Sequence, residues 1–161
     1  MVKFKNRYLL LEVITDDHVV TSKEQFNDSD VYFAMWEALS ELHGDYGTGA
    51  AKQSLSVKVC NSATATVVAR ISRGSLEMLA NSLCFVRKIG KHPAVIRTLH
   101  LGGSMRSCEK ALLKIHRRRL LTSLPSAKTH QARRDIQQAI KASCGGQSEP
   151  DMPQSWPPDD D

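Results

Sequence analysis

Two adjacent glycines, Gly102 and Gly103, precede a segment whose cations are spaced to bind phosphate. At about 100° per residue, a helix over residues 104–121 brings four cations to one side: Arg106, Lys110, Lys114 and Arg117. Its apolar side chains gather on the opposite side, as in a helix that docks on a core: Met105, Cys108, Ala111, Leu112 and Ile115. Arg118 and Arg119 widen the charge at the C-terminal end, where cations also suit the helix dipole.

The start of this helix is a candidate anion site. Glycines let a ligand approach the backbone closely, and the first-turn N–H groups, near Ser104 and Arg106, lack partners within the helix. A charge stripe alone is more often a solvated face. The glycines and the stripe together favour a phosphate-binding surface.

A second set of cations opens the chain. Lys3, Lys5 and Arg7 alternate with apolar residues, so that a strand presents them on one face about 6.7 Å apart, close to the phosphate repeat of a single RNA strand. The alternative is an ordinary basic terminus.

The sequence gives little support for a catalytic site or a metal site. The carboxylates of the basic region, Glu77, Glu109 and Asp135, are widely separated, and no GxSxG, HExxH or P-loop motif is present. The six histidines are scattered and fit surface or strand-end positions better than a general base. The four cysteines have no zinc-ligand spacing and indicate reduced thiols, so we expect no bound metal or other cofactor.

Charge is segregated along the 161 residues, although the net charge is only +5. Residues 1–45 hold 4 basic and 9 acidic side chains, residues 46–143 hold 18 and 3, and residues 144–161 hold 0 and 5. Such a concentrated positive region repels itself unless a polyanion offsets it, and nucleic acid is the commonest polyanion. A merely soluble basic surface is the alternative. No apolar run is long enough for a membrane span, and we expect no secretory signal.

Periodicity predicts the elements that position these residues. Strands are expected at 1–14, 55–59, 65–71 and 93–101, and helices at 27–43, 74–88, 104–121 and 129–143. The first strand is apolar on both faces in its second half, which favours a central position. Gly44 suits a helix C-terminal cap, with Gly47 and Gly49 in a following loop.

The β-α-β-β-α-β order predicts an α+β, ferredoxin-like or RRM-like split βαβ fold with additional C-terminal helix. We expect a domain over 1–122, a helical extension over 123–143 and a disordered acidic tail over 144–161. RRM-type domains stack bases on aromatic residues of central strands, but the hairpin strands offer only Leu, Val, Ala, Thr and Ser. RNA contact is therefore expected with phosphate and shape rather than with splayed bases.

Two stretches carry a family resemblance. MVKFKNRYLLLEV at the start and TLHLGGSMRSCEKALLKIHRRRL around the glycine pair resemble the Pop five family, a small protein subunit shared by ribonuclease P and ribonuclease MRP. HGDYGTGAA, residues 43–51, resembles the helix-terminating loop of that family. The similarity runs from about residue 1 to about residue 121.

The resemblance implies a non-catalytic RNA-binding subunit that supports 5′ leader removal from precursor tRNA and rRNA precursor processing. It implies that catalysis resides in the RNA with bound magnesium, that a TIM-barrel-like protein subunit is a partner, and that the protein is in the nucleus and nucleolus. By position, the resemblance assigns RNA contact to Lys3, Lys5, Arg7, Tyr8, Gly102, Gly103, Arg106 and Lys110. The helix analysis adds Ser104, Lys114, Arg117 and Arg118.

Two alternatives remain. One is a small acylphosphatase-like enzyme with Arg106 as an anion clamp, although no phosphate loop lies near the first strand. The other is a protein-interaction module that uses apolar positions such as Phe4, Tyr32, Phe33 or Trp36. A subunit of a larger particle needs protein interfaces too, so this second alternative is compatible with RNA binding.

Overall fold

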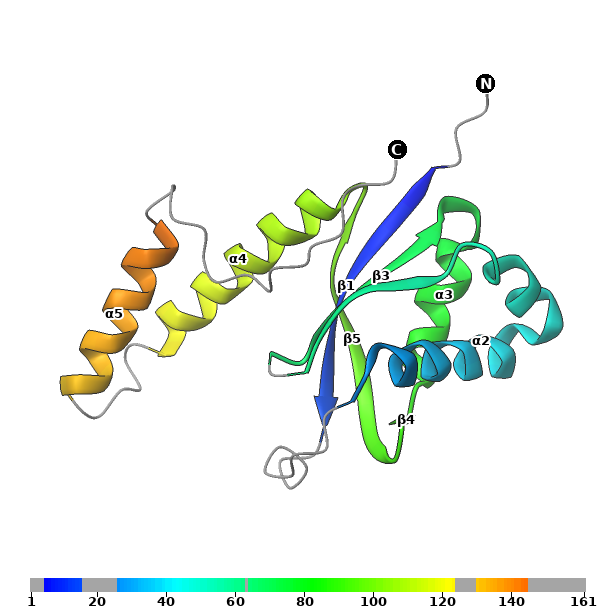
Figure 1. The fold of residues 1–161 in the computed structure, drawn as a ribbon, viewed down its shortest axis with the longest axis horizontal. Helices are drawn as coiled ribbons and strands as arrows, with labels where there is room; N and C mark the ends of the chain where they lie inside the picture. The colour runs from blue at the N-terminus through cyan, green and yellow to red at the C-terminus, as the bar shows by residue number, and fades with distance from the viewer. Residues whose placement is uncertain (1–4, 16–25, 63, 124–129, 145–161) are drawn as a thin grey trace. The chain divides into compact units, whose positions relative to one another are not determined.

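The structure is a computed structural model that describes residues 5–15, 26–62, 64–123 and 130–144 (Figure 1). The chain divides into two compact units, one that ends at Cys108 and one that begins at Glu109. The first unit holds the sheet and its covering helices, and the second holds most of helix α4 together with helix α5.

An antiparallel sheet forms the centre of the first unit. Its strands lie in the order β2-β3-β1-β5-β4. The four long strands have these bounds: β1 Asn6–Thr15, β2 Ser56–Asn61, β3 Thr66–Ser72 and β5 His92–Gly102. The short strand β4, Lys88–Ile89, pairs with the start of β5 at one edge. Without β4, this order is that of a split βαβ unit, so the predicted ferredoxin-like α+β fold is confirmed.

Strand β1 is central, as its two apolar faces predicted. It pairs with β3 on one side, where Tyr8 lies opposite Arg70, and with β5 on the other, where Tyr8 lies opposite Gly102. The register between β1 and β5 shifts between Leu10 and Leu11, which indicates a bulge in this ladder. Asn6 is the first residue of the strand, Lys5 precedes it, and residues 1–4 lie outside the described residues.

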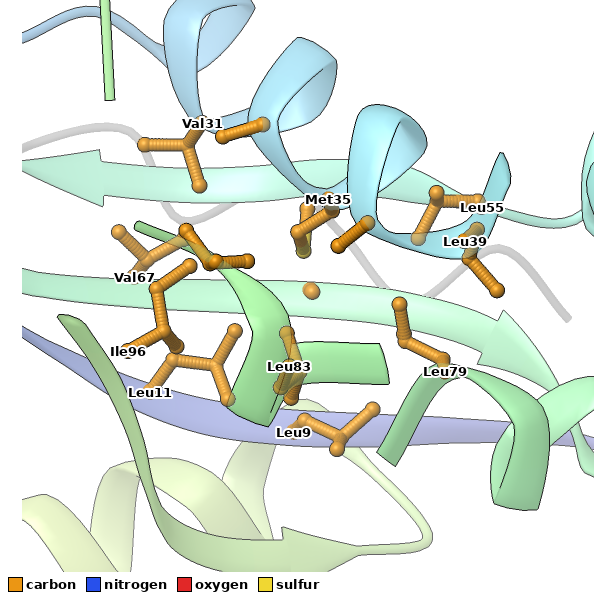
Figure 2. Close-up of a cluster of buried hydrophobic side chains, with 14 of the residues drawn as sticks. Leu9, Leu11, Val31, Met35, Leu39, Leu55, Val67, Leu79, Leu83 and Ile96 are labelled. Atoms are coloured by element: carbon orange, nitrogen blue, oxygen red, sulfur yellow. The ribbon is translucent and has the colours of Figure 1, made fainter. Parts of the chain in front are cut away.

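Two helices cover one face of this sheet (Figure 1). They are α2, Asp28–Ala51, and α3, Leu76–Ser82, the latter flanked by 3-10 turns at Arg73–Ser75 and Leu83–Phe85. Figure 2 shows side chains of both layers interdigitating between sheet and helices. Leu9, Leu11 and Ile71 of the sheet, and Met35 and Leu39 of α2, are each 1% exposed or less. Burial on this scale supplies the main stabilisation of the unit.

Helix α2 continues past the point where the sequence predicts its end. Its start is as expected, since the N–H of Asn27 donates to the Asp30 carboxylate over 3.0 Å. Gly44 leaves helical geometry with φ 59° and ψ −151°, so it does interrupt the helix. The chain then re-enters a helix that runs to Ala51, and the predicted loop through Gly47 and Gly49 is wrong. The Thr48 hydroxyl donates a hydrogen bond to the Asp45 carbonyl oxygen over 3.0 Å, which helps to hold this turn.

The other predicted elements of this unit are found with adjusted bounds. The hairpin of β2 and β3 forms as expected, with the N–H of Thr64 donating to the Asn61 side chain over 3.2 Å. The predicted helix over 74–88 is too long, because its last residues turn through a 3-10 segment and Lys88–Ile89 becomes strand β4. Sheet pairing with β5 replaces the helical hydrogen bonds there.

Helices α4, Met105–Ser123, and α5, His130–Cys144, confirm the two predicted C-terminal helices. No helix in the described part of the chain is long and apolar enough to cross a membrane. The division into 1–122, 123–143 and 144–161 stays a prediction, and the expected disorder of the acidic tail falls on residues outside those described.

Gly44 and Gly49 provide a matched test of the interrupted helix. A Cβ on either would meet no atom within 4 Å, so the two differ in backbone conformation and not in space. We expect Gly44→Ala to destabilise the protein by about 1–3 kcal/mol, because its φ and ψ are accessible almost only to glycine. Gly49→Ala should stabilise it by about 0.5–1 kcal/mol, since Gly49 is helical. Urea unfolding followed by circular dichroism measures both, and equal effects would contradict the interruption at Gly44.

Candidate nucleic-acid interface

The start of β1 and the end of β5 bring Arg7 to the glycine pair. Because Tyr8 lies opposite Gly102 in the sheet, Arg7 lies beside the turn that leads into α4. A Cβ on Gly103 would lie 3.9 Å from Arg7 Nη1, so the guanidinium group sits next to this glycine. The same Nη1 donates to the Asn6 carbonyl over 3.0 Å, which holds the half-buried Arg7 side chain in place.

The turn from β5 into α4 is packed tightly around Gly102. A Cβ on this buried glycine would lie 2.9 Å from Cβ and Oγ of Ser107 and 3.3 Å from the Ser104 carbonyl oxygen. Any larger residue would therefore push the first turn of α4 away from the sheet. The glycine is required because Ser107 of the same chain packs against it. The predicted approach of a ligand to the glycine pair stays a prediction.

Ser104 caps the first turn of α4. The N–H of Ser107 points to both the Ser104 carbonyl, over 3.2 Å, and the Ser104 hydroxyl, over 3.4 Å. The expectation that the first-turn N–H groups are unpartnered is therefore wrong for Ser107, whose donor is already used. The predicted anion binding at this end would depend on the remaining amides and on cationic side chains.

His100, for which the sequence predicted a surface or strand-end position, lies near the end of β5 and is part of this turn. His100 Nε2 lies 2.9 Å from Ser107 Oγ, which links the end of β5 to the first turn of α4 across seven residues. No spacing rule identifies such a pair in advance, because it exists only once the strand and the helix have folded back on each other. His100 is thus a positioning residue for the turn.

Tyr8 is buried, with 7% of its surface exposed. Its carbonyl oxygen lies 3.7 Å from the thiol sulfur of Cys108, which is fully buried. Burial raises the pKa of the Cys108 thiol to about 11, so this group stays neutral at physiological pH and acts as a packing residue. The Tyr8 ring therefore supports the strand from within and offers little surface to a ligand.

Helix α4 carries the exposed cations that its periodicity predicted. Six Lys or Arg residues and one acid, Glu109, lie within it. Arg106, Lys110, Lys114, Arg117, Arg118 and Arg119 are all exposed. Met105 and Cys108, on the predicted apolar side, are buried, which confirms the amphipathic assignment of the first turns. Successive cations one turn apart rise by about 6 Å along the helix, which suits contact with a line of phosphates.

The other residues predicted to contact RNA differ in how exposed they are. Lys5 is exposed, Ser104 is half-buried and Gly103 is exposed, while Lys3 lies outside the described residues. In the part of the chain that the structure describes, no group of three or more His, Cys, Asp or Glu side chains is placed to hold a metal ion. RNA contact by the predicted residues stays a prediction.

The sequence matches a model of the Rpp14/Pop5 family over residues 7–113. It is 30% identical to ribonuclease P/MRP protein subunit POP5 of Homo sapiens over 148 residues, which cover 89% of this chain and 90% of that protein. It is 32% identical to the same subunit of Danio rerio over 146 residues, covering 87% and 85%. Ribonuclease P protein component 2 of Pyrococcus abyssi is 30% identical over 109 residues, covering 68% and 85%.

The fold resembles a chain in the cryo-EM structure of yeast ribonuclease MRP, with a TM-score of 0.51. The likeness covers 74% of this chain and 94% of the yeast chain at 12% sequence identity. At such low identity, the comparison shows a shared fold and says nothing about individual residues.

The two glycines at the start of α4 test how the turn is built. We expect Gly102→Ala to destabilise the protein by about 1–3 kcal/mol, because its new methyl group would overlap Ser107. Gly103→Ala is the matched control, since its methyl group would meet only the end of Arg7 at an ordinary distance. Urea unfolding gives the stability of both variants. An unaffected Gly102→Ala variant would mean that Ser107 does not pack on this glycine.

Proposed function

The chain belongs to the Rpp14/Pop5 family, and on that basis we propose that it is a protein subunit of ribonuclease P, ribonuclease MRP or both. In this proposal it binds the catalytic RNA and supports 5′ leader removal from precursor tRNA and the processing of rRNA precursors. The observation that carries the RNA-binding part is the row of exposed cations on α4, which begins at the closely packed glycine turn.

Helix α4 contains six cations and only one acid, so most of its cations have no acidic partner within the helix. Phosphate groups would offset this charge and release bound counterions, which is the main source of affinity in protein–RNA contacts. Arg7 and Gly103 lie together at the first turn of α4, and we include both in the proposed surface. We also include Lys5 and Ser104, and Lys3, which lies outside the described residues, because the sequence predicts RNA contact for all three.

The surface offers cations rather than stacking rings. Tyr8, the aromatic residue at this end of the sheet, is buried, and the described aromatic residues with the largest exposure, Phe33 and Tyr46, lie on α2. We therefore propose that the contact is with phosphate and RNA shape, and not with unstacked bases. Tyr8 and Gly102 would act indirectly, by holding the strand and the turn in place.

We further propose that this protein contributes no catalytic group. The RNA, with its own bound magnesium, would hydrolyse the phosphodiester bond, while the cations of α4 screen repulsion between packed RNA helices. A TIM-barrel-like subunit and other proteins of the particle would be its protein partners, and the nucleus and nucleolus its location.

Purification of the tagged chain from cells tests membership of the particle. Sequencing of the bound RNA at moderate salt should recover one or two small structured RNAs, and the purified material should cleave precursor tRNA or an rRNA precursor. Recovery of no RNA above background would overturn the proposal. An active preparation that keeps its activity when this protein is depleted would also contradict a supporting role.

Neutralising three cations of α4 should weaken RNA binding. We expect the triple variant Arg106→Gln, Lys110→Gln and Lys114→Gln to lose affinity for a hairpin RNA, with the slope of log K against log salt reduced by about 2–3. The control removes three exposed cations from turns and connections outside α4, Lys52, Arg87 and Lys91, so that both variants have the same net charge. Filter binding across a salt series measures the slopes. Equal losses in the two variants would show that net charge, and not α4, governs binding.

A further inference from the structure

We propose that the acidic C-terminal segment of this chain binds the cations of α4 and competes there with RNA. The segment is residues 145–161, which lie outside the described residues. Its binding surface consists of four exposed residues of the second unit, and we call it the α4 cation surface: Lys110, Lys114, Arg117 and Arg118. This competition rests on the proposed function, because it concerns a surface that is also proposed to bind RNA.

The charges of the two parts are complementary. Residues 145–161 contain five acidic side chains and no Lys, Arg or His. Helix α4 holds six cations and one acid, Glu109. Within the part of the chain that the structure describes, no ion pair engages the α4 cation surface. The segment therefore supplies the negative charge that the helix itself lacks.

The cations around the turn between β4 and β5 suit an acidic segment less well. There, Lys88 pairs with Glu37 of α2 over 3.3 Å. A Cβ on Gly90 would lie 3.5 Å from the carboxyl carbon of Asp30, so a second acid of α2 faces this turn. An acidic segment would meet like charge at this place. No acidic residue lies between Lys110 and Arg118, so the charge pattern selects α4.

The segment is long enough to reach this surface. Helix α5 ends at Cys144, and it belongs to the same compact unit as the α4 cation surface. An extended chain spans about 3.3 Å per residue, so residues 145–159 can bridge up to about 50 Å. The 19 residues of α4 measure about 28 Å at a rise of 1.5 Å per residue. A contact within one molecule is therefore within reach, and the shared chain raises its effective concentration.

Such a contact would select among RNAs. Ion pairs between exposed side chains are individually weak and are screened by salt. An RNA that matches the whole surface supplies many phosphates and releases many counterions, so it displaces the segment. An RNA that touches only a few cations gains less and is excluded more effectively. We therefore expect the segment to lower the affinity of this protein for nonspecific RNA.

Carbodiimide cross-linking of the purified full-length chain tests the contact. This reagent joins a carboxylate to an amine that touches it, and mass spectrometry identifies the joined residues. We expect cross-links from the acids of residues 145–161 to Lys110 and Lys114, at yields severalfold above those to exposed Lys52 and Lys91. A hairpin RNA should reduce these cross-links by competition, and high salt should reduce them by screening.

Two results would overturn the contact. Yields to Lys110 and Lys114 that are no higher than those to Lys52 and Lys91 would show that the segment has no preference for α4. Cross-links found only between two chains, with yields that rise with protein concentration, would assign the acids to a second copy of this chain.

Neutralising the segment measures its effect on RNA binding. The variant changes five acids to their amides: Glu149→Gln, Asp151→Asn, Asp159→Asn, Asp160→Asn and Asp161→Asn. We expect its affinity for an unrelated hairpin RNA to rise about three- to tenfold at low salt, because the competitor is removed, and the gain should vanish at high salt. Filter binding across a salt series measures both.

A matched control separates this effect from net charge. It neutralises five exposed acids of other elements: Asp28→Asn, Glu37→Gln, Glu41→Gln, Asp45→Asn and Glu77→Gln. The two variants have the same net charge, and urea unfolding shows whether both are folded. An equal gain in affinity would show that net charge, and not contact with α4, is responsible.

A combined variant locates the effect on α4. The neutralised segment is joined to Lys110→Gln and Lys114→Gln, and each set of substitutions is also measured alone. The gain from neutralising the segment should be clearly smaller in this background, because the acids have lost partners. A gain of full size would contradict the contact.

Failure of this contact and failure of the proposed function are distinguishable. Cross-linking uses the protein alone, whereas membership of the particle is tested by the RNA recovered from cells. Cross-links to α4 in a chain that recovers no cellular RNA would support the contact and contradict the function. Recovery of RNA with cleavage of precursor tRNA, but without cross-links to α4, would support the function and contradict the contact.

Discussion

The burial of β1 on both of its faces is the constraint on which the rest of the structure depends. Leu9 and Leu11 are 1% and 0% exposed beneath the helices, and Tyr8 and Leu10 are 7% and 0% exposed on the other side of the sheet. The strand is also hydrogen-bonded along both edges, to β3 and to β5. Moving β1 would disrupt both ladders and both apolar layers together. The position of Arg7 beside Gly103 therefore follows from the core.

Opposite charges are distributed to different helices instead of being mixed on each. Helix α2 is acidic without a single Lys or Arg, and helix α4 has six cations and one acid. Charges on exposed helical faces add little to stability, so neither pattern is needed for folding. Their separation matters for association, because the cations of α4 attract a polyanion. The proposed RNA partner for α4 is consistent with this separation.

Close packing and backbone conformation explain why glycines recur at two junctions. Gly44 adopts φ 59° and ψ −151°, where a side chain would be strained, and it redirects α2 without ending it. Nearby, a Cβ on Gly47 would lie 2.3 Å from the Cβ of His43, so the turn closes only around a glycine there. Gly102 is required by close packing, since Ser107 occupies the space that a side chain on Gly102 would need.

The sequence by itself determined the order of the long strands and helices, the central place of β1 and the amphipathic division of α4, because these depend on local periodicity and on patterns of burial. It also identified Arg106, Lys110, Lys114 and Arg117 as one exposed row. It missed the short edge strand β4, which exists only through its pairing with β5. Only the tertiary structure decided that α2 resumes beyond Gly44, that Ser104 already uses the Ser107 amide, and that His100 meets Ser107. These features depend on contacts between segments whose approach is set by the packing of the whole sheet, and no local pattern encodes such an approach.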